Sequence, residues 1–169
     1  MTPPADFSDP ARSMLWRAIL AFLALPGMVA FAVPLWLAWS ERARRGAALW
    51  PAAWLVVLAG ASLLLWCVRE FYVAGRGTLA PWAPPRSLVA SGPYRLSRNP
   101  MYIGVILVLL GWAALFRSRT LLVYALAVAI AFHLRVLVSE EPWARRTFGA
   151  DWEDYRARVP RWLPRLRKS

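Results

Sequence analysis

The sequence offers few groups for disulfides or metal sites, because it contains one cysteine, Cys67, and one histidine, His133. A single cysteine excludes an intramolecular disulfide and a multi-cysteine metal centre, and a lone histidine without partner ligands gives poor support for a metal site. Acidic residues are also scarce, with 9 Asp and Glu against 21 Lys and Arg. We therefore expect no bound metal, and we expect Cys67 to be a small buried apolar residue.

Apolar residues, by contrast, make up 59% of the 169 residues, which is too much for a soluble core of this size. Four apolar runs approach the roughly 17–25 residues that a membrane-spanning helix needs. They cover residues 15–39, 47–68, 100–116 and 121–138. We predict an all-α integral membrane protein with about four transmembrane helices. Prolines at positions 26 and 34 predict a bend in the first run, which is either one kinked helix or a re-entrant pair.

The net charge of +12 is compatible with nucleic-acid binding, but in a chain with four spans basic residues more commonly sort the loops across the bilayer. With these spans, fifteen basic residues fall on one side and five on the other. Both termini and the long central loop are therefore expected in the cytoplasm, with the protein in the inner or plasma membrane. The amphipathic tail at residues 161–168 would lie against anionic lipid headgroups, so we expect membrane lipids and no nucleic acid as partners.

The chain divides into two predicted regions. Residues 1–74 hold the first two spans, carry few polar groups and are predicted to be a membrane scaffold. Residues 75–169 hold a long polar loop, a helical hairpin and the tail, and are predicted to be the catalytic region. The loop at residues 74–99 is rich in glycine and proline, which fits either a ligand-binding segment or a linker lying on the membrane.

Asn99 and Pro100 predict the start of the third span, because asparagine is a favoured N-cap and proline is favoured at the first helical position. Capping does not explain Arg95 and Arg98 just before this point, or Tyr102 in the first turn. We expect the polar ends of these three side chains to converge near the helix N-terminus, which favours anionic groups such as a carboxylate.

Only four residues, 117–120, join the third and fourth spans, so the two helices must form an antiparallel hairpin. Tyr102 and the pair Glu140-Glu141 then lie at the same depth. These glutamates are expected at a helix C-terminus, where they oppose the helix dipole and need a ligand or an arginine partner. His133 shares the face of Glu140 in an α-helix and is either a packing residue or a functional one, whereas Arg135 is about 140° away.

Three motifs in order give the chain a resemblance to a known family. They are Arg98-Asn99-Pro100-Met101-Tyr102-Ile103-Gly104, then Glu140-Glu141, then a tail with Phe148-Gly149, Trp152, Tyr155, Val159-Pro160 and Pro164. This pattern resembles isoprenylcysteine carboxyl methyltransferases and related phospholipid methyltransferases. The resemblance implies S-adenosylmethionine as methyl donor, bound in a pocket that faces the cytoplasm. Many members have histidine where this chain has Asn99, and an amide cannot act as a base near neutral pH.

The resemblance implies that Arg98 and Glu141 are catalytic. It implies a set of cofactor-binding residues made of Tyr94, Arg98, Asn99, Pro100, Tyr102, Gly104, His133, Glu140 and Glu141. The expected reaction is methyl transfer to an amphiphilic acceptor: an isoprenylcysteine-like carboxylate, a thiol, a phospholipid amine or a related lipid. A membrane NADPH-dependent sterol-type reductase and a non-catalytic membrane adaptor are the alternatives, and the sequence leaves the acceptor and the oligomeric state open.

Overall fold

A computed structural model of the chain describes residues 23–40, 51–74 and 87–163. Within these residues every regular element is helical, which confirms the all-α class for this part of the chain. The elements are η1 (Leu23–Ala32), α2 (Val33–Ser40), α3 (Pro51–Val73), η2 (Gly92–Arg95), α4 (Pro100–Phe116), α5 (Arg119–Arg135), η3 (Val136–Glu140), α6 (Glu141–Phe148) and α7 (Ala150–Arg158). The predicted features at residues 15–22, 47–50, 75–86 and 164–168 lie outside the described residues.

Two of the four predicted spans are long and apolar enough to cross a membrane, Pro51–Phe71 and Arg119–Phe148. The other two, Gly27–Trp39 and Pro100–Phe116, are apolar but shorter. Length and composition of the described helices therefore support two candidate spans.

The first apolar run is one continuous helical segment in its described part, because η1 leads directly into α2. Its first ten residues, which include Pro26, have π-helical hydrogen bonding. Proline has no N–H to donate, and a wider turn is one way in which a helix accommodates the missing hydrogen bond. This continuity favours the bent single helix over the re-entrant pair.

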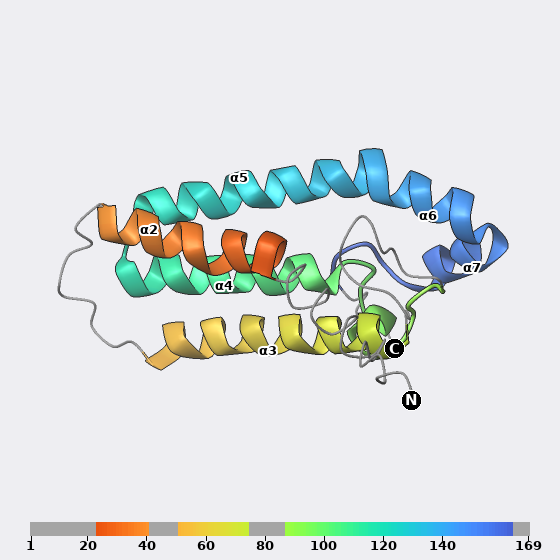
Figure 1. Cartoon of the computed structure of the whole chain (residues 1–169), viewed down its shortest axis with the longest axis horizontal. Helices are drawn as coiled ribbons and strands as arrows, with labels where there is room; N and C mark the ends of the chain where they lie inside the picture. The colour runs from red at the N-terminus through yellow and green to blue at the C-terminus, as the bar shows by residue number, and fades with distance from the viewer. Residues whose placement is uncertain (1–22, 41–50, 75–86, 164–169) are drawn as a thin grey trace, which may run out of the picture.

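The helices α3 and α4 lie side by side along the long axis of the molecule (Figure 1). They approach each other closely at Gly60 of α3 and Gly104 of α4. A Cβ atom on Gly60 would lie 2.7 Å from the carbonyl oxygen of Gly104 and 2.8 Å from the backbone nitrogen of Val108, closer than real Cβ atoms come. Small residues thus set the spacing of these two helices, as they commonly do between helices in membranes.

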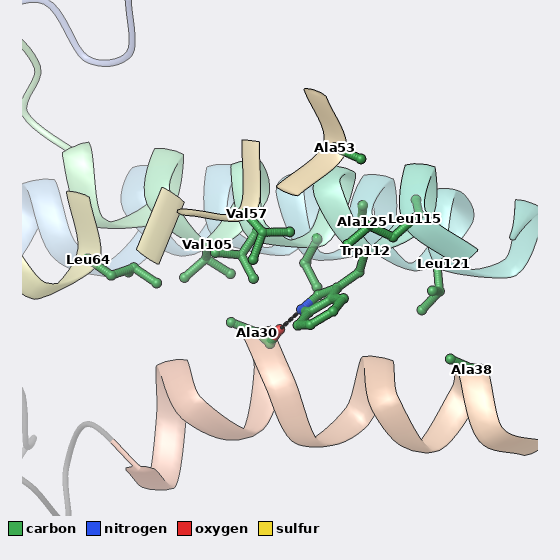
Figure 2. Packing of buried hydrophobic residues seen from close by; sticks show 13 residues of the cluster. Ala30, Ala38, Ala53, Val57, Leu64, Val105, Trp112, Leu115, Leu121 and Ala125 are labelled. Atoms are coloured by element: carbon green, nitrogen blue, oxygen red, sulfur yellow. Dashed lines mark hydrogen bonds between the residues drawn. The ribbon is translucent and has the colours of Figure 1, made fainter. Parts of the chain in front are cut away.

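The main apolar cluster lies between these helices and the first helical segment. Figure 2 shows Trp112 of α4 reaching across to η1, where its indole Nε1 donates a hydrogen bond of 3.0 Å to the carbonyl oxygen of Ala30. Tyr124 of α5 donates to the neighbouring carbonyl of Val29 at 3.3 Å. Two aromatic side chains therefore attach η1 to the hairpin.

The turn between α4 and α5 confirms the predicted antiparallel hairpin. Arg117 ends α4 in the left-handed conformation with φ 48°, and the hydroxyl of Ser118 caps α5 by accepting from the backbone N–H of Leu121 at 3.2 Å. Helix α5 does not end near residue 138 as expected. It continues through η3 into α6, so the helical segment runs on to Phe148 (Figure 1).

The chain then turns back at Gly149, whose positive φ of 52° separates α6 from α7. Trp152 and Tyr155 of α7 pack with Ala144 and Val159 in a small buried cluster of their own. This cluster places the residues after α7 beside the start of α4, where the polar groups of the sequence motifs meet.

Candidate active site

The site is built around Glu141, whose carboxylate binds two arginines from distant parts of the chain. Arg98, just before α4, donates from a terminal guanidinium nitrogen to Glu141 Oε1 at 2.9 Å. Arg161, after α7, donates from Nε to Oε1 at 2.7 Å and from a terminal nitrogen to Oε2 at 3.0 Å. The side chains of Arg98 and Glu141 are only 9% and 15% exposed. Paired, charge-assisted hydrogen bonds with this much shielding are stronger than ordinary surface ion pairs.

Arg98 has an unused donor. Its Nε is buried and has no hydrogen-bond partner among the described residues. The guanidinium group also lies 5.6 Å from the ring centre of Trp152, a cation–π distance. Burial lowers the pKa of Arg98 from its usual value and the nearby Arg161 acts in the same direction, while Glu141 opposes both. A buried cation with an unpaired N–H is a suitable partner for an incoming anion.

Glu140 forms a second polar group beside the first. The hydroxyl of Tyr102 donates to Glu140 Oε1, and Arg135 Nε donates to the same oxygen at 2.8 Å. The Tyr102 ring stacks on Phe132 of α5 with ring centres 4.1 Å apart. The hairpin therefore does bring Tyr102 level with the two glutamates, as the four-residue connection predicted.

Two expectations about the glutamates are wrong, and one local feature explains both. Residues 136–140 form a π turn in which the N–H of Glu141 bonds to the carbonyl of Val136, five residues earlier. This turn accommodates Pro142, which has no N–H for the carbonyl four residues before it. The helix therefore continues past Glu141, so the glutamates do not oppose a helix C-terminus, and residues five apart such as Arg135 and Glu140 meet instead of lying about 140° apart.

The residues after α7 close one side of the site. The carbonyl of Pro160 accepts from the Arg98 backbone N–H at 2.9 Å, and the carbonyl of Arg161 accepts from Asn99 Nδ2 at 3.1 Å. Trp162 Nε1 donates to His133 Nδ1 at 3.2 Å.

The other predicted site residues lie around this centre in different ways. Asn99 and Pro100 do start α4, but the Asn99 side chain bonds to Arg161 and does not cap the helix. Tyr94 is buried against Phe71 of α3, and its carbonyl accepts from the Tyr155 hydroxyl at 2.7 Å. Burial raises the pKa of the Tyr94 phenol well above its usual value, so it stays protonated. Its ring packs against α3 in a small buried cluster with Cys67 and Val89.

One predicted site residue, Gly104, also has a packing role, and one expectation at this site is wrong. Gly104 lies at the α3–α4 contact, where a Cβ would be 3.1 Å from the carbonyl oxygen of Gly60, so helix packing accounts for its place in the motif. Arg95 is exposed and forms no ion pair with the other described site residues. The predicted convergence at the helix start therefore holds for Arg98 and Tyr102 alone.

Sequence reasoning missed Ser97, Trp152, Arg161 and Trp162 as neighbours of the site. Ser97 donates to the Arg161 carbonyl at 3.2 Å, so it shares the acceptor that Asn99 uses. The tail motif around Val159-Pro160 was the one signal for these contacts. Arg161 was expected at the lipid headgroups, and the structure instead directs its side chain to Glu141.

A further missed residue is Glu70, a buried carboxylate near the end of α3. It accepts from Trp66 Nε1 at 3.2 Å and from the Ser91 hydroxyl at 2.5 Å. Gly92 follows with φ 54°, and a Cβ there would lie 2.8 Å from the Glu70 carboxyl carbon. Glu70 thus fixes the start of the segment that carries Tyr94 and Arg98.

The residues present fit the amino-acid part of S-adenosylmethionine. That part carries a carboxylate and an ammonium, and the site supplies the unpaired Arg98 Nε beside the carboxylates of Glu140 and Glu141. Groups of three or more His, Cys, Asp or Glu that could hold a metal do not occur among the described residues.

Comparison with known proteins decides the family. A sequence model described as phospholipid methyltransferase matches residues 52–151, which is more than half of the chain. The chain belongs to the phospholipid methyltransferase family. The resemblance found in the motifs is thereby confirmed, and a methyltransferase is the class of enzyme that the family supports.

The chain is similar to several curated proteins. It is 32% identical over 123 residues to methanethiol S-methyltransferase 2 of Bradyrhizobium diazoefficiens, covering 67% of this chain and 43% of that protein. It is 34% identical over 105 residues to a nickel-cobalt-cadmium resistance protein of Alcaligenes xylosoxydans xylosoxydans, covering 60% of this chain and 43% of that protein. The chain thus spans less than half the length of these curated relatives. No solved structure matches it.

Proposed function

We propose that this protein transfers a methyl group from S-adenosylmethionine to an amphiphilic acceptor at a membrane. The observation that carries the proposal is the meeting of Arg98 and Tyr102 with Glu141 and Glu140, together with the unpaired buried Nε of Arg98. The family supports methyl transfer, and the donor and acceptor are our inference from the chemistry of these groups.

The charges suggest how the residues divide their roles. Arg98 Nε binds the carboxylate of the donor, because it is a cationic N–H that lacks a partner. Glu140 and Glu141 bind the ammonium or the ribose hydroxyls as hydrogen-bond acceptors. Asn99 has a donor and an acceptor but no base, so it contributes hydrogen bonding and no proton transfer. His133, Tyr94, Pro100 and Gly104 complete or support the predicted cofactor site.

S-adenosylmethionine supplies a methyl group activated by a positively charged sulfur. An acceptor heteroatom forms the new bond to the methyl carbon, the carbon–sulfur bond breaks, and its electron pair returns to sulfur. A thiolate or carboxylate acceptor releases no proton, whereas an amine loses one afterwards. The protein therefore contributes mainly alignment and exclusion of water, which can supply several kcal/mol without a covalent step.

The acceptor is proposed to be amphiphilic because the site adjoins apolar helices. Tyr102 lies in the first turn of α4, and its hydroxyl contacts Glu140 within the long helical segment Arg119–Phe148, a candidate span. We propose that all four apolar runs are membrane segments and that both termini face the cytoplasm of the inner or plasma membrane. An isoprenoid carboxylate or thiol, or a phospholipid amine, could then keep its chain in the bilayer, and remote apolar contacts would align its head.

Calorimetry on the detergent-purified protein tests the donor. We expect saturable binding of S-adenosylmethionine and S-adenosylhomocysteine, and no comparable binding of NADPH. Tight NADPH binding would favour the sterol-type reductase, and binding of neither ligand would favour the adaptor. Arg158→Ala, which removes an exposed arginine outside the site, is the matched control and should bind like the parent.

The acceptor class needs a separate experiment. Methyl-labelled donor is supplied to membranes with the parent protein and with Glu141→Ala, and the products are partitioned between organic and aqueous phases. Label that depends on the parent protein and enters the organic phase supports an amphiphilic acceptor. Label confined to small water-soluble or volatile products, such as a methylated small thiol, would contradict it.

A further inference from the structure

Residues 159–162, which we call the C-terminal strap, lie across the donor site that we propose. Their backbone is bound to the segment before α4 by three hydrogen bonds. The Arg98 N–H donates to the carbonyl of Pro160 at 2.9 Å, and Ser97 and Asn99 both donate to the carbonyl of Arg161, at 3.2 Å and 3.1 Å. The strap backbone is therefore hydrogen-bonded to the three residues that directly precede α4.

The side chains of the strap reach the opposite wall. Arg161 binds Glu141 at the start of α6, and Trp162 binds His133 of α5. Arg161 thus links two sides of the site: its carbonyl accepts from Asn99, just before α4, and its guanidinium binds Glu141, at the start of α6. Within the described residues, the other direct link from the segment before α4 to Glu141 is the single hydrogen bond from Arg98.

The geometry of the Arg161 contact determines how the carboxylate is held. Two parallel N–H groups bind both oxygens of Glu141, and this arrangement fixes the carboxylate plane, which one hydrogen bond from Arg98 cannot do. Arg161 is one third exposed, so the energy of the ion pair itself is modest. Its main effect is on orientation.

We propose that Arg161 is a positioning residue, which holds the Glu141 carboxylate in the orientation that receives the donor. The inference rests on the proposed function, and it adds a specific task for a residue outside the motif around Arg98 and the glutamate pair. A lysine at this position keeps the charge and loses the two-pronged contact, so charge and orientation can be separated.

The test measures S-adenosylhomocysteine binding by calorimetry on the full-length protein. Arg161→Ala should weaken binding about tenfold, and Arg161→Lys should recover only part of this loss. Arg158→Ala removes the same charge three residues earlier and should bind like the parent. Added methylguanidinium should restore binding to Arg161→Ala and leave Arg158→Ala unchanged, a result that loss of folding alone would not give.

The outcomes separate the two proposals. If the parent protein does not bind S-adenosylhomocysteine, the proposed function fails and this inference fails with it. If the parent binds and Arg161→Ala binds equally well, the inference alone is wrong. If Arg161→Ala does not fold, Arg161→Lys decides: binding equal to the parent would overturn the orientation argument, and weaker binding with an unchanged melting temperature would support it.

Discussion

The guanidinium of Arg98 lies 2.9 Å from the carboxylate of Glu141, 43 positions later in the chain, and both side chains are largely shielded from solvent. We predict that Arg98→Ala and Glu141→Ala each weaken donor binding by roughly 10–150-fold, because each removes a shielded charge-assisted contact and leaves its partner charge unpaired. Calorimetry with S-adenosylhomocysteine measures the change. Asp154→Asn, at an exposed position on α7, is the control for loss of a carboxylate. Parental affinity in both alanine variants, with normal expression, would place the donor site elsewhere.

A substitution at Tyr102 can test the contribution of a single hydroxyl group. Tyr102→Phe removes the hydroxyl that donates to Glu140 and keeps the ring that stacks on Phe132. We predict weaker donor binding or turnover with little change in melting temperature, because the packing is retained. Phe132→Leu is the complementary variant, since it removes the stacking and keeps the hydroxyl. Equal turnover in Tyr102→Phe and the parent would show that the hydroxyl has no part in the reaction.

Asn99 stands where the resemblance to the family leads us to expect histidine. We predict that Asn99→His is tolerated, because a ring N–H can replace the amide N–H that donates to the Arg161 carbonyl. Asn99→Asp should weaken donor binding, since a carboxylate cannot donate and would face that carbonyl oxygen. Turnover of labelled donor compares the three proteins. An Asn99→Asp variant as active as the parent would show that this hydrogen bond is dispensable.

Gly60 tests the close approach of α3 and α4. Gly60→Ala should destabilise the protein by about 1–3 kcal/mol, because the added methyl would lie 2.7 Å from the Gly104 carbonyl oxygen and the backbones must separate. Thermal unfolding in detergent measures this loss. Leu58→Ala on the exposed face of α3 is the control and should change stability by only about 0.5 kcal/mol. A melting temperature unchanged in Gly60→Ala would contradict the tight contact.

The proposed orientation in the membrane predicts which loops react with an impermeant thiol reagent. Arg119→Cys, at the turn between α4 and α5, should be labelled from outside the cell. Arg146→Cys on α6 should be labelled only after the membrane is permeabilised. Both positions are exposed, and the native Cys67 is buried and should not react. The reverse pattern would overturn the orientation inferred from the basic residues.

The hairpin and the main polar contacts could be predicted because short-range signals determine them. Four residues between two apolar runs leave an antiparallel pair as the only arrangement, and Asn99-Pro100 marks a helix start. The register near the glutamates could not be predicted, because the periodicity argument assumed α-helical geometry through the π turn before Pro142. A single extra residue per turn changes which side chains meet.

The contacts of the C-terminal strap were beyond sequence reasoning for a different reason. Arg161 bonds to Asn99 across 62 positions and to Glu141 across 20, and no periodicity links them.

The burial of Gly104 against α3 was missed because the family motif and helix packing select the same residue. A single sequence cannot show whether a glycine is required by the family motif, by helix packing or by both.

The hydrogen bonds from Trp112 and Tyr124 to the carbonyls of Ala30 and Val29 have a consequence for assembly. If the helices insert into the bilayer separately and associate afterwards, apolar contacts between them compete with equally apolar lipid tails and select no particular alignment. Lipid tails offer no hydrogen-bond acceptor to an indole N–H or a phenol. The alignment of η1 that places the carbonyls of Ala30 and Val29 opposite these two donors is therefore favoured over other alignments along the hairpin. The two hydrogen bonds would therefore fix the position of η1 along the hairpin. Helix η1 lies outside the residues that the family model matches.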